Sequence, residues 1–541
     1  MNGISFECTR AEDHLQADFL VACEQTQPKI NVPAMRALVP KESEIASCIN
    51  LLHVLAKQRI RKRFEKVHSI ALTADSYRNV ASRDVIGITA HGCTENFDAV
   101  SAVISVEEAD FSQTGDAIAE VLRKAANEVF PSDKMMISAV VTDNAPNYRA
   151  AGRSLTEDSI GCAAHLLQLV VRDVCDEKKL NPELKQLLKN VATFQANFRA
   201  HKGALNSLDG LRGSCGKKVL RPVFPVVTRW NYDFLMAVRY LALAKSFRAV
   251  TDHMGLTAES NQPSKEDSAV LRQYVRCMRP LYEATEKLCA EKKPTLCMVA
   301  HEYRHLFDSI SALPASNLRD DILSSMTTRL LPAIETPSLA LMAAAVAPYY
   351  SDLSKVCSKE GVIDQVMEQI VRLAVDLERV NTGGHIEAEF EDMVRAGFRS
   401  MTSQFERMSA AEKETFKDPL KYWKGKCSSK TLISLLPVVQ LLLSIPATSA
   451  PVERVFSRFT YTHSSRRARL NTHVASKCVM IGSNMGYDEP PISEEEVRVM
   501  QDALNAEQKP VAVEELDEVD EEDTSPGQNE VDEVAENEAL E

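Results

Sequence analysis

The order of apolar segments between residues 67 and 177 is the feature that most restricts how this chain can fold. Alternating segments rich in β-branched residues predict strands, and a continuous apolar run is typical of a strand covered on both faces. The expected strands span residues 67–74, 85–91, 99–106, 134–142 and 160–165. Between the third and fourth of them, residues 115–130 have apolar side chains at helical spacing. This part of the chain therefore predicts an α/β unit around one sheet.

Two acidic residues come directly after predicted core strands. Asp75 follows IALTA, and Asp143 follows MMISAVVT and precedes Asn-Ala-Pro. An aspartate in such a place commonly forms a turn or caps a helix. The order of three strands, a helix, and then strand, helix and strand resembles an RNase H-like fold, in which the chemistry depends on acids at strand ends. The two aspartates are therefore also candidates for a site.

A third acidic residue lies far downstream, in the stretch 441–470. Pro446 ends the apolar helix before it, Ser449 is placed to cap a new helix, and Pro451 suits the first turn of that helix. Apolar side chains then fall at helical spacing, at Val452, Val455, Phe456 and Phe459. Glu453 lies beside this stripe. It is interpreted either as a first-turn acid that favours the positive end of the helix, or as part of a site.

Several motifs resemble those of hAT-superfamily transposases. The C-terminal signature is matched by ATSAPVERVFS, and the segments LTADSYRNV, VTDNAPN, GCAAHLLQL, TRWNYDFL and PLKYWKG resemble further family motifs. The resemblance covers about half of the chain, at residues 40–250 and 418–486. It implies an RNase H-like core interrupted by a large helical insertion domain. It also implies a DNA transposase that acts as a homodimer or higher oligomer through its C-terminal region, in the nucleus.

The resemblance also implies a site. Asp75, Asp143 and Glu453 would be the three carboxylates that bind two Mg²⁺ or Mn²⁺ ions and cleave or transfer DNA strands. Arg229 and Trp230 would grip the DNA, with the indole stacked on an unpaired base, although a buried tryptophan at a helix start is an equally good interpretation. Cys162 and His165 form a C-x-x-H pair, which is expected to be architectural; a place for His165 near the acids is a second interpretation.

Three departures from the family pattern support an alternative function. Tyr77 replaces the usual Trp, Val452 replaces the usual Ser, and Phe459-Thr460 replaces Ala-Gly. The BED-type zinc finger of most members is not visible, because Cys8 and Cys23 have no matching Cys/His set. The alternative is a catalytically inactive, transposase-derived nuclear protein that dimerises and binds DNA or regulates. An RNase H-like nuclease unrelated to transposition fits the motifs less well.

The expected domains follow from these patterns. They are an N-terminal helical segment (1–66), a first core part (67–177), a helical insertion (178–430), a last core part with the dimerisation region (431–486) and an acidic disordered tail (487–541). The basic run 57–66 is a solvated helix face, a phosphate contact or a nuclear-import signal. The apolar face at Leu432, Leu435, Leu436, Val439, Leu442 and Leu443 is wide enough for the core plus a partner.

Charge is unevenly distributed along the chain. Residues 487–541 hold 21 acidic and 2 basic residues, so the preceding 486 residues carry about +6 within a whole-chain charge of −13. A mildly basic body is compatible with nucleic-acid binding, and the tail either solvates the protein or screens the body from DNA. The 13 Cys include no C-x-x-C pair, which indicates reduced thiols. Since no apolar run approaches the roughly 20 residues that span a bilayer, no membrane partner is expected.

Overall fold

The computed structural model describes most of the chain between residues 42 and 499. The described residues are 42–79, 82–130, 135–156, 159–175, 181–215, 220–223, 230–256, 262–291, 293–463, 470–485, 493, 495, 496, 498 and 499. The described residues do not include Arg229, the basic segment 464–469, the helix expected within residues 1–41 or nearly all of the acidic tail. Tertiary contacts group residues 1–491 into one unit and residues 492–541 into a second. Within the described residues, no helix is long and apolar enough to cross a membrane.

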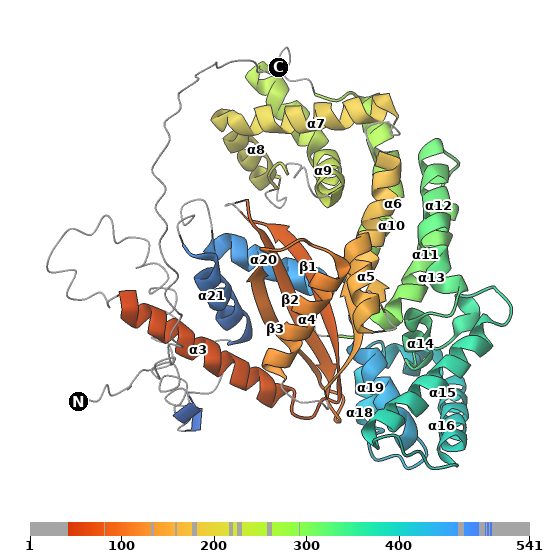
Figure 1. Ribbon diagram of the computed structural model, residues 1–541. Coiled ribbons are helices and arrows are strands. Elements are labelled where there is room, and N and C mark those ends of the chain that lie inside the picture. The colour runs from red at the N-terminus through yellow and green to blue at the C-terminus, as the bar shows by residue number, and fades with distance from the viewer. Residues whose placement is uncertain are drawn as a thin grey trace, which may run out of the picture. The chain divides into compact units, whose positions relative to one another are not determined.

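A five-stranded mixed sheet lies at the centre of the first unit, in the order β3-β2-β1-β4-β5 (Figure 1). The strands are β1 (Ser69–Arg78), β2 (Asp84–Cys93), β3 (Ala99–Glu108), β4 (Met136–Thr142) and β5 (Ser159–Gly161). β1 pairs antiparallel with β2 and parallel with β4, β2 pairs antiparallel with β3, and β4 pairs parallel with β5. All five strands were expected, but β1 runs four residues further than predicted.

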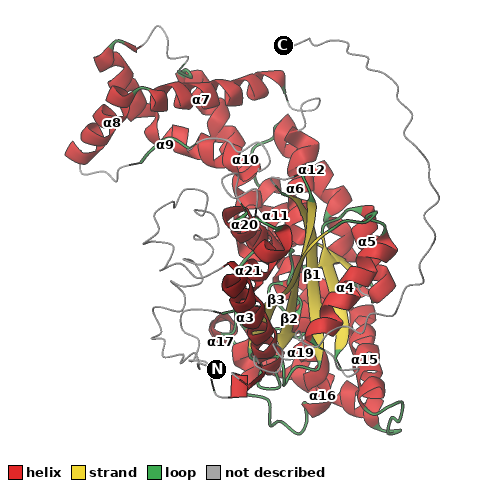
Figure 2. Ribbon diagram, turned by 60° about the vertical axis from the view of Figure 1, so that its left-hand side comes forward, coloured by secondary structure: helices red, strands yellow, loops and turns green. Residues whose placement is uncertain are grey.

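Helices α4 (Gly115–Val129) and α5 (Pro146–Leu155) cover one face of the sheet with an apolar core (Figure 2). α3 (Glu42–Arg63) contacts both α4 and α21 (Thr472–Asn484). The basic run at the end of α3 takes part in this packing. Lys57 forms an ion pair with Glu128 at 2.9 Å, and Arg61 donates to the carbonyl oxygens of Glu128 and Val129 at the end of α4. These side chains are thus used in helix packing, and the run is more than a solvated face.

Three C-terminal helices cover the opposite face: α19 (Leu436–Ser444), α20 (Ala450–Thr462) and α21. α21 also protects the exposed edge of β3. The Asn484 amide accepts from the backbone N–H of Val103 at 3.1 Å and donates to the Val103 carbonyl at 2.8 Å. One side chain therefore satisfies the N–H and C=O of Val103, which an edge strand would otherwise leave unpaired.

The middle of the chain is helical, as predicted. Its helices are α6 (Ala163–Cys175), α7 (Pro182–Ala200), α8 (Lys202–Ser214), α9 (Trp230–Met254), α10 (Lys265–Leu288), α11 (Val299–Ser311), α12 (Asn317–Arg329), α13 (Leu331–Glu335), α14 (Leu339–Ala345), α15 (Val362–Asn381), α16 (Phe390–Arg407), α17 (Ala410–Thr415) and α18 (Pro419–Lys424). Short 3₁₀ turns are η2 (Leu296–Met298), η3 (Leu353–Lys355) and η4 (Ile433–Leu435). The predicted division of residues 1–486 into four parts stays a prediction, because contacts join them in one unit.

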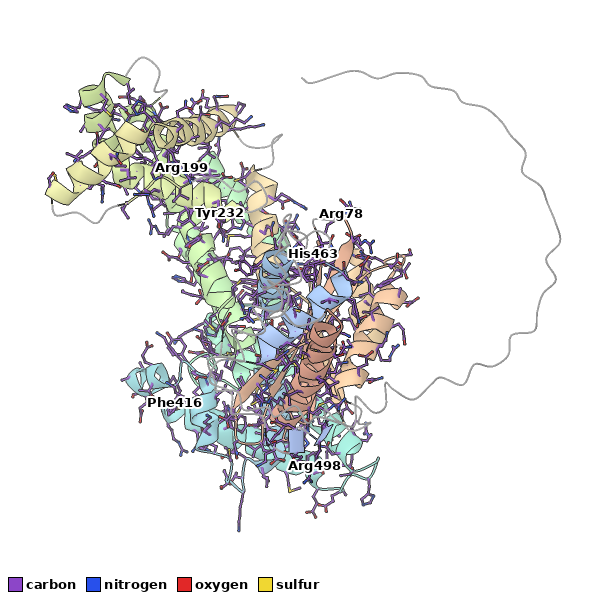
Figure 3. All side chains as sticks on the ribbon, turned by 90° about the vertical axis from the view of Figure 1, so that its left-hand side faces the viewer. Arg78, Arg199, Tyr232, Phe416, His463 and Arg498 are labelled. Carbon is purple, nitrogen blue, oxygen red and sulfur yellow. The ribbon has the colours of Figure 1, made fainter. Side chains whose placement is uncertain are left out.

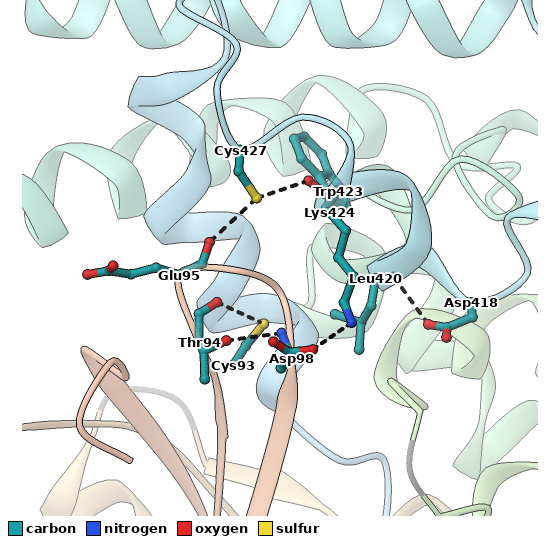
Figure 4. Close-up of polar contacts among 9 residues, drawn as sticks. All are labelled: Cys93, Thr94, Glu95, Asp98, Asp418, Leu420, Trp423, Lys424 and Cys427. Atoms are coloured by element: carbon teal, nitrogen blue, oxygen red, sulfur yellow. Dashed lines mark hydrogen bonds and ion pairs between the residues drawn. The ribbon is translucent and has the colours of Figure 1, made fainter. Parts of the chain in front are cut away.

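α18 fixes the end of this helical region to the turn between β2 and β3 (Figure 4). Trp423 is fully buried, its ring stacks on Phe97 with centroids 5.8 Å apart, and its Nε1 donates to the Val346 carbonyl at 2.8 Å. Lys424 forms an ion pair with Asp98 in the same turn at 2.5 Å. The second tryptophan of the chain therefore serves packing. The helical region is joined here to the sheet edge at which β1 begins, opposite the C-terminal end of β1.

Candidate functional site

Asp75 lies within β1 and not after it as predicted, paired with Gly87 of β2. Since side chains alternate between the faces of a strand, Asp75 shares its face with Thr73 and Tyr77, the face covered by α20. Its Oδ1 accepts from the Ser76 backbone N–H at 2.8 Å. Strand geometry thus aims this carboxylate at the C-terminal helices.

Asp143 comes directly after β4, as predicted. Its Oδ1 accepts from the Ala145 backbone N–H at 3.1 Å, which forms the turn into α5. β1 and β4 are parallel and pair Ala74 with Thr142, so the next residue of each strand is an aspartate. Parallel pairing therefore brings Asp75 and Asp143 to adjacent positions in the sheet. Asp143 is both a turn former and a candidate site residue.

Glu453 is held over these aspartates by the packing of α20 on β1 and β2. The predicted stripe of Val452, Val455, Phe456 and Phe459 is buried. Gly87 allows this close approach: a Cβ there would lie 2.8 Å from Val452 Cγ1 and 2.9 Å from Phe456 Cε1. The apolar side of α20 thus faces the sheet, and Glu453 on its flank is exposed.

The outer part of α20 is tied to the end of β1. The rings of Tyr77 and Phe456 stack with centroids 5.4 Å apart, and the Thr460 hydroxyl lies 3.0 Å from that of Tyr77. Figure 3, which labels Arg78 just beyond Tyr77 and His463 at the end of α20, shows both ends in the same part of the molecule. Residues that depart from the family pattern therefore pack against one another and help to position α20.

The loop before α20 is fixed by Cys162. Its buried Sγ accepts from the Ser449 backbone N–H at 3.3 Å, and its own N–H donates to the Thr142 carbonyl at 2.7 Å. The N–H of the next residue, Ala163, donates to the Ala447 carbonyl at 2.9 Å. Ser449 occupies the cap position of α20, but its side chain makes no capping bond, contrary to the prediction. These bonds fit the architectural interpretation of Cys162.

One cavity of about 300 Å³ joins these elements. The three predicted carboxylates, Asp75, Asp143 and Glu453, all line it. The other walls come from α6, from the first turn of α9, from the last turn and C-cap of α10, and from α20. These residues are Ala164, His165, Gln168, Trp230, Asn231, Thr285, Glu286, Cys289, Ser449, Ala450, Arg454 and Ser457. The cavity is therefore bounded by the sheet on one side and by the helical region on the other.

The carboxylates in the cavity influence one another. Burial is the main cause that raises the pKa of Asp75 to about 7; the charges of Asp143 and Glu453 contribute to the rise, and the Ser76 hydrogen bond opposes it. Burial lowers the pKa of His165, while the same two acids favour its protonated form. The influence of Asp143 and Glu453 on both groups shows that residues nearly 400 positions apart share one electrostatic environment.

The other predicted site residues are placed as follows. Trp230 is the first residue of α9, half-buried, and lines the cavity. His165 also lines it, from α6; the strand predicted over 160–165 ends at Gly161, so His165 is helical. Cys162 lies behind the cavity lining. Arg229 lies outside the described residues.

Sequence reasoning missed several lining residues. Glu286 and Cys289 come from a helical stretch in which no motif was visible, and Asn231 and Arg454 stand beside residues that were singled out. Arg454 belongs to the ATSAPVERVFS motif. Its place next to the predicted site residue Glu453 is the signal that could have identified it. Glu286 carried no signal, because only the tertiary fold brings α10 against α20.

The oxygen donors of this cavity suit a hard divalent cation. Mg²⁺ and Mn²⁺ prefer carboxylate oxygens, and two like charges already raise the pKa of Asp75, so a nearby cation would relieve their repulsion. In the part of the chain that the structure describes, no three His, Cys, Asp or Glu side chains are already arranged around a single metal position. The donor chemistry fits a metal, and its binding would draw the carboxylates together.

The C-terminal part of the chain is similar to a region of a known protein family. Residues 401–485 match the model of the hAT family C-terminal dimerisation region. The chain is also 20% identical, over 551 aligned positions, to a Talaromyces stipitatus protein described as "Putative transcriptional regulator tpeD". That alignment covers 92% of this chain and 63% of the Talaromyces protein. The chain thus spans less than two thirds of the length of this relative.

Proposed function

We propose that this chain, whose residues 401–485 match the hAT dimerisation region, is a hAT-type transposase or a protein derived from one, and that it cleaves or transfers DNA strands with Asp75, Asp143 and Glu453. The observation that carries the proposal is the cavity shared by these three acids. They come from β1, from the turn after β4 and from α20. A decayed site would have no physical reason to keep mutually repelling carboxylates in one partly buried place.

The sheet supports an RNase H-like core. Three antiparallel strands followed by two parallel ones, in the order β3-β2-β1-β4-β5, agree with the order of elements that the sequence suggested. In this proposal residues 67–177 and 431–486 form the core, and residues 178–430 are an insertion domain that supplies the far wall of the cavity. Within the predicted N-terminal segment 1–66, α3 packs against α4 and α21.

Asp75, Asp143 and Glu453 would hold two Mg²⁺ or Mn²⁺ ions. Such ions activate the attacking water or 3′-hydroxyl and stabilise the leaving oxygen of a phosphodiester. The residues of the chain would supply carboxylates on rigid elements, a cavity partly screened from solvent, and the face of Trp230. Stacking of a base on an aromatic side chain is worth about 1–3 kcal/mol, which would hold the cleaved end beside the acids. Arg229 would add a phosphate contact next to it.

The proposed partners follow from the family. DNA is the substrate, the nucleus is the place of action, and a homodimer or higher oligomer is proposed because residues 401–485 match a dimerisation region. The description of the Talaromyces relative as a transcriptional regulator favours a second candidate function. In it, the chain is a catalytically inactive, dimerising DNA-binding factor that regulates transcription, and the cavity keeps DNA contacts without cleavage.

Strand cleavage can be tested with the purified full chain. We expect Mn²⁺- or Mg²⁺-dependent nicking of supercoiled DNA, and a loss on the order of 10²-fold or more for D75N, D143N or E453Q, because each removes a metal ligand. D110N, which removes an exposed acid outside the cavity, should keep full activity. A well-folded wild type that binds DNA but nicks none with either ion would eliminate the enzyme and leave the regulatory factor.

A further inference from the structure

Arg454 is the one Lys or Arg among the described residues that line the carboxylate cavity. Four acids line the same cavity, namely Asp75, Asp143, Glu286 and Glu453. Successive helical residues point about 100° apart, so Arg454 and Glu453 leave α20 in different directions. The described lining of the cavity is therefore strongly negative, with one arginine at a defined place in its wall.

Two contacts fix the direction of this guanidinium. Nε lies 2.6 Å from Oε1 of Glu291, and Nη1 donates to the Cys289 carbonyl at 3.4 Å. Cys289 is the C-cap of α10, and its carbonyl is at a helix end, where a positive charge is favoured. Arg454 thus reaches across from α20 to the end of α10, and 41% of its side chain stays exposed.

These contacts leave most of the hydrogen-bonding capacity of Arg454 available. A guanidinium has five N–H donors, and the contacts to Glu291 and Cys289 use two of them. The positive charge of Arg454 does not offset the negative charges around Asp75 either. The charged groups that shift the pKa of Asp75 are Asp143 and Glu453, with no basic side chain among them. The remaining donors are suited to an anion that enters the cavity.

A phosphodiester entering a cavity with four acids needs positive charge to offset the repulsion. We propose that Arg454 binds a non-bridging phosphate oxygen of the nucleic acid in this cavity, with Glu291 and the Cys289 carbonyl holding its guanidinium in the required direction. The inference rests on the proposed function in taking DNA as the ligand, but it does not require cleavage. An arginine fork suits phosphate because it presents paired donors in a plane.

A purely structural role gives different expectations. If Arg454 only ties α20 to α10, breaking the tie from either side should have the same effect. E291Q removes the partner and keeps the positive charge, whereas R454Q removes the charge. R454K keeps the charge and loses the fork. R379Q is a matched control, because it removes an exposed arginine of an ion pair with Asp376 on α15, which does not line the cavity.

The experiment measures binding of a labelled single-stranded oligonucleotide to the full chain by fluorescence anisotropy, in Mg²⁺, over a range of salt concentrations. One lost phosphate contact on a single strand reduces the slope of log Kobs against log salt by about 0.7. We expect this reduction for R454Q, and a slope equal to that of the wild type for R454K, E291Q and R379Q. Melting temperatures measured by circular dichroism establish that each variant is folded.

Each outcome either supports or overturns the phosphate contact of Arg454. A wild-type slope for R454Q, or an equal slope reduction in R454Q and E291Q, would overturn the phosphate contact and leave a structural tie. A wild type that binds no oligonucleotide would defeat the inference together with the DNA-binding part of the proposed function. A wild type that binds but never cleaves defeats only the proposed cleavage, and the slope of R454Q still decides the role of Arg454.

Discussion

At the scale of single residues, Gly87 shows how one missing side chain positions an acid. The glycine stands opposite Asp75 in the sheet, and Val452 and Phe456 of α20 occupy the space that its side chain would fill. α20 can therefore lie close enough to the sheet for Glu453 to reach the same cavity as Asp75. The carboxylate geometry depends on a residue that has no functional group of its own.

The first prediction concerns this contact. G87A places a Cβ within 3 Å of two buried side chains, so we expect a loss of about 1–3 kcal/mol in the free energy of unfolding, and a larger loss of nicking than stability explains. Chemical denaturation and the nicking assay measure the two effects. G482A is the control, since a Cβ there meets nothing within 4 Å and alanine favours the helix. Unchanged stability in G87A would contradict the packing.

The second prediction follows from the raised pKa of Asp75. Between its ordinary pKa near 3.8 and about 7, the folded protein keeps a proton that the unfolded chain has lost. The contribution of Asp75 to stability therefore falls as the pH rises from about 4 through about 7. D75N lacks this titration, so its melting temperature relative to that of the wild type should be higher at pH 8 than at pH 4.5.

The same scan tests metal binding at Asp75. Mg²⁺ should raise the melting temperature of the wild type at pH 8 and have little effect on D75N, because the ion binds the ionised carboxylate of the folded state. A difference between D75N and the wild type that is independent of pH would contradict the second prediction. D110N provides the control for the loss of a negative charge elsewhere.

At the scale of elements, the apolar face predicted over residues 432–443, which spans η4 and α19, has a different role from the one predicted. Leu432, Leu435, Leu436, Val439, Leu442 and Leu443 are all at most 9% exposed within the single chain. The expectation that this face serves a partner as well as the core is therefore wrong for these residues. In the described part of residues 401–485, the large apolar side chains that stay exposed are Ile433 and Tyr461.

The third prediction separates folding from assembly. L442A should lower the free energy of unfolding by about 2–5 kcal/mol, because it leaves a cavity in a fully covered helix. The oligomeric state of the folded protein, measured by sedimentation at matched concentration, should not change. I433A, a truncation of a 62% exposed side chain, should leave stability within about 0.5 kcal/mol. Dissociation of folded L442A would show that α19 contacts a partner after all.

At the scale of the whole molecule, the two tryptophans report on two different junctions. Trp423 joins the helical region to the β2–β3 turn and is fully buried, whereas half-buried Trp230 lies in the cavity wall. The helical region therefore meets the sheet both at that turn and at the carboxylate cavity, which lies at the ends of β1 and β4. A ligand in the cavity should be sensed by only one of the two indoles.

The fourth prediction uses this difference. Mn²⁺, which is paramagnetic, and a single-stranded oligonucleotide should each quench the fluorescence of Trp230, and the quenching should persist in W423F. In W230F it should disappear, although the protein still contains Trp423. Quenching that survives in W230F would place the ligand away from the cavity. Because W423F removes the Nε1 hydrogen bond to Val346, its folded fraction must be measured first.

Local patterns in the sequence determined the strands, the middle helices, the buried stripe of α20 and the three acidic candidates, because strand and helix periodicity and proline breaks act over a few residues. The tertiary structure alone decided that Asp75, Asp143 and Glu453 line one cavity, that Gly87 admits α20, and that α10 adds Glu286 and a tether for Arg454. Local periodicity carries no information about which distant segments meet. Packing of whole elements against one another settles that, so the last acid joins the first two only when the C-terminal helices close over the sheet.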